Sequence, residues 1–125
     1  MAAGSYDILI EQGTTFSLVM TIKDSTGSVV DLTGYTFRGK VKKSLSDVAA
    51  VATFTCTKGS QSDPATKGKV TITLTPAQTS AIPLTVSGVY HTLTPMVYDI
   101  ESETTGGEVT RWLQGVANIS PEVTT

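Results

Sequence analysis

Cysteine and histidine are almost absent from this sequence, since a chain of 125 residues has one of each, Cys56 and His91. A single cysteine excludes a disulfide within the chain, and one cysteine with one histidine cannot complete a structural zinc site. Cys56 alternates with Phe54 in the run Ala52-Thr53-Phe54-Thr55-Cys56, so we predict a small buried apolar side chain rather than a reactive thiol. The sequence therefore predicts a domain that its core alone holds together.

Charge is also sparse: only 16% of the residues are charged, and the two signs nearly cancel. The net charge is −2 and the sequence pI is near 5.2, which gives no overall attraction for nucleic acid. No apolar run approaches membrane-spanning length, and residues 1–6 lack the charged leader and apolar core of a secretion signal. We therefore expect no nucleic-acid partner and no membrane, with synthesis and assembly in a cytoplasm.

Reactive side chains at catalytic spacing are missing as well. His91 has Ser87 and Asp99 nearby in the sequence, but the residues around Ser87 lack the flanking pattern of a nucleophile elbow. Asp99 and Glu101 are expected on one outward face of a strand, so they cannot straddle a substrate as the two carboxylates of a glycosidase do. The sequence therefore predicts that the chain is not an enzyme.

Metal and cofactor sites are not expected either. Asp24 and Asp31 flank a turn that could hold calcium, yet the full ligand spacing of a calcium loop is absent. A hydrogen-bonded turn is the better interpretation of these two residues. No phosphate-binding loop occurs, so we predict no metal, no cofactor and no catalytic residue.

Alternation of apolar and polar residues with a period of two is what the sequence does have. Such alternation is typical of strands with one buried face, and turn residues separate about seven to nine of these runs. We predict a single domain over residues 1–125, an all-β, immunoglobulin-like antiparallel β-sandwich with an arm at 1–5 and a tail at 120–125. A small barrel is the main alternative. The expected strands are 6–12, 15–23, 28–31, 35–43, 51–57, 69–74, 89–101 and 108–119.

Other segments have more local signals. Thr75 and Pro76 can cap and start a short helix over 75–82, which would form the one helical crossover between the sheets. Leu32, within a turn, is expected to close one end of the core. The stretch 58–68 is poor in apolar residues and rich in turn formers, so it is predicted to be a mobile loop. Pro95 is expected to interrupt its strand, leaving an edge or a bulge there.

Two features are candidates for an interface. Arg38, Lys40 and Lys42 recur at every second position, which places them on the solvated face of one strand, where they could also protect a sheet edge. Trp112 lies out of phase with Val109, Leu113 and Ala117, which are expected to share a face. It either packs in the core while Arg111 faces water, or is exposed as an interface anchor. With Tyr35, Tyr90 and Tyr98, it could also form a stacking platform for sugars.

Several motifs together resemble those of a known group. These motifs are Gln12-Gly13-Thr14-Thr15-Phe16, Lys23-Asp24-x-x-Gly27, Asp31-Leu32-Thr33-Gly34-Tyr35, Val70-Thr71-Ile72-Thr73-Leu74-Thr75 with Gln78-Thr79, Tyr98-Asp99-Ile100-Glu101, Val109-Thr110-Arg111-Trp112-Leu113-x-Gly115 and Ser120-Pro121-Glu122-Val123-Thr124. With them, the chain looks like small structural proteins of tailed bacteriophages, and its first half resembles the N-terminal domain of phage upper baseplate proteins, which attaches fibres or receptor-binding parts to the tail.

The resemblance implies a non-enzymatic virion component present in several copies, with other virion proteins as partners and assembly in the host cytoplasm. The first hypothesis is an accessory module of the tail, baseplate or fibre. Baseplate proteins of this kind normally continue into a further domain, whereas this sequence ends at Thr125, so capsid decoration is the alternative. A carbohydrate-binding module for host attachment, based on Trp112 and the tyrosines, is the third hypothesis.

Overall fold

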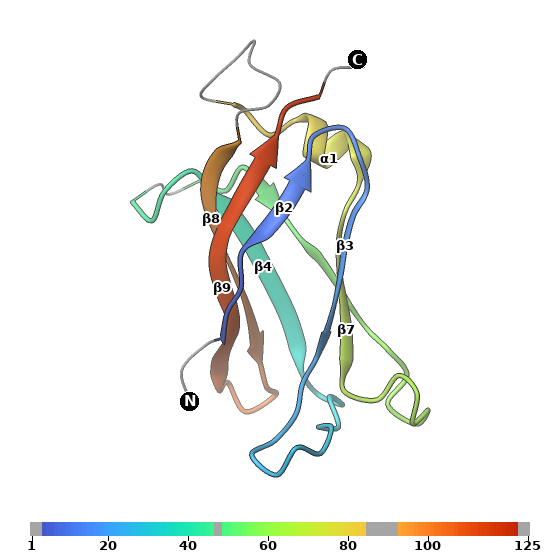
Figure 1. Cartoon of the computed structure of the whole chain (residues 1–125). Coiled ribbons are helices and arrows are strands. Elements are labelled where there is room, and N and C mark those ends of the chain that lie inside the picture. The colour runs from blue at the N-terminus through green and yellow to red at the C-terminus, as the bar shows by residue number, and fades with distance from the viewer. Residues whose placement is uncertain (1–3, 47–48, 85–92, 123–125) are drawn as a thin grey trace.

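Two β-sheets packed face to face make up the protein in a computed structural model that describes residues 4–46, 49–84 and 93–122. Figure 1 shows β9, β8 and β4 in one layer, and β3 and β7 in the other. The elements are β1 (Gly4–Ser5), β2 (Ile8–Glu11), β3 (Phe16–Thr21), β4 (Thr36–Lys42), β5 (Ala52–Thr53), β6 (Thr55–Lys58), β7 (Lys69–Leu74), α1 (Pro76–Ser80), β8 (Thr94–Glu103) and β9 (Val109–Ser120).

The strand order is that of an immunoglobulin-like sandwich. The six-stranded sheet has the order β1-β9-β8-β4-β5, with β2 also paired to β9, and the three-stranded sheet has the order β3-β7-β6. Taking β3, β4, β6, β7, β8 and β9 as strands B to G gives B-E-D in one sheet and C-F-G in the other, as in that fold. The predicted all-β sandwich with one short helix is therefore confirmed.

The core lies between the two sheets and is built by the predicted alternation. Along β4, β7 and β8, every second side chain is buried and its neighbours are more exposed. Leu32 is fully buried, which confirms that this turn residue closes one end of the core. The largest fully buried apolar side chains are Ile10, Leu32, Val41, Val70, Ile72, Leu74, Ile82, Met96, Ile100 and Ile119.

One predicted strand is divided between the two sheets. The run 51–57 was expected as a single strand, but β5 pairs with β4 whereas β6 pairs with β7. Phe54 stands at the crossing, where its backbone N–H donates to the carbonyl of Gly39 at 2.9 Å. Its ring contacts those of Phe16 and Tyr98, with centroids 5.8 and 6.2 Å away. The crossing therefore places an aromatic side chain between the layers.

The N-terminal strand also differs from its prediction. Residues 6–12 were expected as one strand, but β1 and β2 are separate, and both run parallel to β9. Between them, the Asp7 carboxylate accepts a hydrogen bond from the backbone N–H of Val116 at 3.0 Å. The Tyr98 hydroxyl donates to the carbonyl of Tyr6. Side-chain hydrogen bonds thus supplement the backbone bond from Tyr6 to Gln114 where the strand is interrupted.

The helix has the predicted start. Thr75 accepts from the backbone N–H of Gln78, and the Gln78 side chain accepts from the backbone N–H of Thr75, which completes a capping box with Pro76 in the first turn. The helix follows β7 of the three-stranded sheet, and the chain then returns to β8 of the other sheet. This is the expected crossover, although its turns end at Ser80 rather than at residue 82.

Two other strand predictions are wrong in part. The expected strand 28–31 is reduced to a single bridge between Lys23 and Val29. Pro95 does not interrupt its strand: β8 runs through it, paired with β9, while β4 ends opposite Val97. No described strand therefore flanks Pro95 on the β4 side, where a missing N–H is tolerated. Residues 89–92 of that prediction lie outside the described part of the chain.

The long connection 58–68 has a defined set of hydrogen bonds. The Gln61 side-chain oxygen accepts from the backbone N–H groups of Leu32 at 2.9 Å and Gly68 at 3.1 Å, and its amide donates to the Gly59 carbonyl at 2.7 Å. One side chain therefore joins this loop to the turn that inserts Leu32 into the core. Within the described part of the predicted tail, residues 120–122, the backbone N–H of Glu122 donates to the Gln12 side chain at 3.0 Å.

Candidate interaction face

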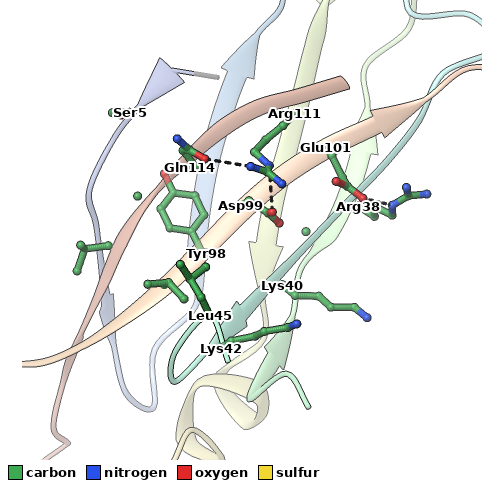
Figure 2. A pocket seen from close by; sticks show the side chains of 14 residues that line it. Ser5, Arg38, Lys40, Lys42, Leu45, Tyr98, Asp99, Glu101, Arg111 and Gln114 are labelled. Atoms are coloured by element: carbon green, nitrogen blue, oxygen red, sulfur yellow. Dashed lines mark hydrogen bonds and ion pairs between the residues drawn. The ribbon is translucent and has the colours of Figure 1, made fainter. Parts of the chain in front are cut away.

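The outward face of the six-stranded sheet has an open hollow of about 600 Å³. Strands β1, β9, β8 and β4 supply its walls and floor, and Figure 2 shows charged side chains along it. Three rows cross the strands in register: Lys42, Val97 and Val116; Lys40, Asp99 and Gln114; and Arg38, Glu101 and Arg111. The hollow thus combines a row of two valines and a lysine with two rows that hold charges of both signs.

Arg38 links two carboxylates of the neighbouring strand. Its Nε lies 2.6 Å from Glu101 Oε1, and its Nη1 lies 2.8 Å from Glu103 Oε1. The hydrogen bonds to Glu103 and Glu101 raise the pKa of Arg38 above its ordinary value. Since the pairs are partly exposed, they contribute little to stability, but they give two carboxylates of β8 a shared basic partner.

Arg111 of β9 pairs with the third carboxylate of β8, that of Asp99. Its Nε lies 3.3 Å from Asp99 Oδ2, and its Nη1 donates to Gln114 Oε1 at 3.4 Å (Figure 2). The three acidic residues of β8 therefore all have a basic partner. This arrangement needs the register of β4 against β8 and of β8 against β9, which the sequence alone does not give.

Lys40 and Lys42 share the outward face with Arg38, as predicted from their spacing. Lys40 lies opposite Asp99 in the ladder, but Asp99 pairs with Arg111. Among the described residues, no carboxylate lies within ion-pair distance of either lysine. The structure therefore brings the three predicted basic residues together and gives an acidic partner to only one of them.

Trp112 lies on the core side of β9, which decides between the two packing alternatives. A bulge places Leu113 opposite Ile100 and Arg111 opposite Glu101, so that Trp112 is the extra residue. The half-buried indole packs against the core and donates from Nε1 to the Ser102 hydroxyl at 2.8 Å. The side chain of Arg111 is 53% exposed. A contact of Trp112 with a partner stays a prediction.

The same bulge corrects the predicted phase of the last strand. Val109, Leu113 and Ala117 were expected on one face, but Val109 is 49% exposed, whereas Leu113 packs against the core and Ala117 is buried. One extra residue shifts a strand of period two to its other face. Trp112 and Leu113 are therefore consecutive residues that both contact the core.

Replacing Ser102 by alanine tests the environment of the single tryptophan. Ser102 is 1% exposed, so Ser102→Ala leaves the indole N–H without its partner. We expect the free energy of unfolding to fall by about 1 kcal/mol, measured by urea unfolding with tryptophan fluorescence. The exposed Ser17→Ala on β3 is the control and should change stability by less than about 0.5 kcal/mol. Equal stabilities for both variants would contradict this hydrogen bond.

The outward face of the three-stranded sheet is different in character. Register places Ser17, Thr73 and Thr55 in one row across β3, β7 and β6, and Val19, Thr71 and Thr57 in the next. Five of these six side chains end in a hydroxyl, and Val19 is 56% exposed. The face is thus rich in hydroxyl groups, and β3 and β6 are its edge strands among the described elements. Which residues share a row depends on strand pairings that the sequence alone does not show.

The residues weighed as catalytic or metal-binding are not brought together in the described structure. His91, Ser87 and Tyr90 lie outside the described residues. Asp24 and Asp31 each accept hydrogen bonds from a threonine two positions later, and these bonds lower the pKa of each carboxyl. Within the described residues, no group of His, Cys, Asp and Glu side chains could hold a metal ion, and no helix there is long and apolar enough to cross a membrane.

Cys56 is half-buried on β6, and burial raises the pKa of its thiol to about 11. Because the thiolate is the nucleophile, only about one thiol in a thousand is reactive at pH 8. We expect alkylation by iodoacetamide at pH 8 to be about a hundredfold slower than in the urea-unfolded chain, followed by mass spectrometry. The rate should rise steadily towards pH 11. Equal rates in the folded and unfolded chain would show that the thiol is exposed.

No protein-family model matches the sequence, and no curated protein matches it.

Proposed function

We propose that this chain is a non-enzymatic structural protein of a tailed-bacteriophage virion, an accessory module attached to the tail, baseplate or fibre. The resemblance of its turn and strand motifs to phage structural proteins supports the assignment. The structural observation that best supports the assignment is the pattern of ion pairs on the outward face of the six-stranded sheet. There, each of the three carboxylates of β8 forms an ion pair with Arg38 or Arg111.

Such pairing matters for assembly because an unpaired buried charge is costly. A neighbouring subunit that covered this face would take paired carboxylates out of water, which costs less than burying them alone. The hydroxyl-rich face of the three-stranded sheet offers a second surface of few charges. Two dissimilar faces suit contacts with different neighbours, as in heterologous assembly.

Copy number in purified virions tests the proposal. We expect particles of the encoding phage to hold from a few to some tens of copies per particle, measured by quantitative mass spectrometry against the major capsid protein. A copy number near that of the capsid protein would support capsid decoration instead. Particles that lack the chain would contradict both assignments.

A glycan array distinguishes carbohydrate binding for host attachment from the tail and capsid-decoration assignments. Trp112, the main residue of that hypothesis, packs towards the core with its indole N–H bound to Ser102. We therefore expect no retention of the purified protein on the array. Specific retention that is lost in Trp112→Phe would instead favour the carbohydrate-binding hypothesis.

A further inference from the structure

We propose that the hollow on the six-stranded sheet is the docking site for an extended acidic segment of a neighbouring virion protein. The carboxylates of that segment bind Lys40 and Lys42, and its apolar side chains contact Val97 and Val116. The neighbour's identity as a virion protein rests on the proposed function. The acidic chemistry of the segment rests on the hollow alone.

The first observation is a local excess of positive charge. The carboxylates that line the hollow, Asp99 and Glu101, pair with Arg111 and Arg38. Lys40 and Lys42 have no ion-pair partner among the described residues, and Figure 2 draws no interaction from either amino group. A ligand that brings carboxylates is therefore complementary to this side of the hollow, whereas a basic ligand is not.

The second observation is the spacing of the two lysines. They stand two positions apart on β4, which corresponds to about 7 Å along a strand. Side chains on one face of an extended peptide recur at the same distance. An extended segment lying along β4 with acidic residues at alternate positions can therefore place one carboxylate at each lysine.

The third observation is the pair of valines, Val97 and Val116, in the same row as Lys42. Val97 lies opposite Lys42 in one ladder and opposite Val116 in the next, and all three line the hollow. Leu45, which also lines it, is 89% exposed. These side chains supply apolar contact area next to the charges, as the core of a protein interface requires. Charge and apolar surface together favour a peptide over a simple anion.

The same features argue against nucleic acid as the occupant. A phosphate backbone needs a stripe of basic residues, but here two lysines stand beside the carboxylates of Asp99 and Glu101. The net charge of the whole chain is −2, which opposes a polyanion at longer range. A short acidic segment, in contrast, requires only the local excess of positive charge at Lys40 and Lys42.

Binding of soluble poly-L-glutamate to the full chain tests the docking site directly. In NMR titrations at low ionic strength, where screening is weak, we expect amide shifts centred on Lys40, Lys42 and Val97. The double variant Lys40→Glu/Lys42→Glu should weaken binding by about tenfold or more. Lys69→Glu, on the other sheet, should change it by less than about twofold. Thermal unfolding of each variant confirms that it is folded.

Several results would overturn the site. Absence of shifts, or shifts centred on the three-stranded sheet, would contradict it. An equal loss of affinity per reversed charge in Lys69→Glu would reduce the effect to net charge. An oligothymidylate that binds the same residues more tightly than poly-L-glutamate would identify a nucleic-acid surface instead.

Incorporation into virions separates this inference from the proposed function. We expect the double variant to reach particles at less than about a tenth of the wild-type copy number, with Lys69→Glu incorporated normally. If wild type and double variant are incorporated equally, the docking site is wrong and the virion assignment stands. If the wild-type chain is absent from particles, the virion assignment fails, and the peptide titration alone decides on the acidic site.

Discussion

Phe54→Ala is expected to lower the free energy of unfolding by about 3–5 kcal/mol. Phe54 is 5% exposed and lies where the chain crosses between the sheets. Its ring contacts Phe16 of one sheet and Tyr98 of the other. Removal of the ring leaves a cavity between the layers, because neighbouring backbone relaxes only in part. Urea unfolding measures the loss.

Two further variants, one conservative and one at an exposed position, serve as comparisons for Phe54→Ala. Phe54→Leu keeps much of the apolar volume and should lose less than Phe54→Ala. Leu45→Ala removes a side chain that is 89% exposed and should change stability by less than about 0.5 kcal/mol. If Phe54→Ala were as stable as Leu45→Ala, the ring would not lie between the sheets, and the crossing would be placed wrongly.

Gly115→Val is expected to destabilise the fold by about 3 kcal/mol. A Cβ at this position would overlap the Tyr6 carbonyl oxygen and lie 2.8 Å from its carbon and 3.0 Å from Asp7 Oδ1. Relief of this overlap moves the backbone between β1 and β2 away from β9. That movement also breaks the bonds from the Tyr98 hydroxyl to Tyr6 and from Val116 to Asp7.

Amide exchange identifies where Gly115→Val acts. The backbone N–H of Tyr6 donates to Gln114 at 2.9 Å, so its protection should be lost in the variant while that of β7 remains higher. Gly106→Val is the matched control, since a Cβ there meets only Thr104 Oγ1 at 3.8 Å. Wild-type stability in Gly115→Val would contradict the parallel attachment of the N-terminal strands.

Much of the fold could be predicted because its information is local. Alternation in β3, β4 and β7 follows from side chains that face the core at every second position. The helix start follows from Thr75, Pro76 and Gln78, whose capping roles depend only on near neighbours. The burial of Leu32 could be predicted because an apolar side chain within a polar turn is more stable in the core than in water.

The rest depends on pairings between distant segments. Phe54 keeps the alternation in phase while the chain changes sheets, so no break in the pattern marks the crossing. The bulge at Trp112 reverses the phase of β9 through the pairing of Ile100 with Leu113. In the candidate site, Arg38, Lys40 and Lys42 were predicted to share a face. Which of them forms an ion pair with a carboxylate could not be predicted, because that depends on the register between strands.

The most direct test of the account is a difference map between cryo-electron microscopy reconstructions of wild-type virions and virions that lack this chain. We predict difference density for a β-sandwich on the tail, baseplate or fibre, with the Lys40 and Lys42 face turned towards a neighbouring subunit. No difference density anywhere on the particle would contradict the account. Density spread over the capsid lattice would place the chain on the head instead.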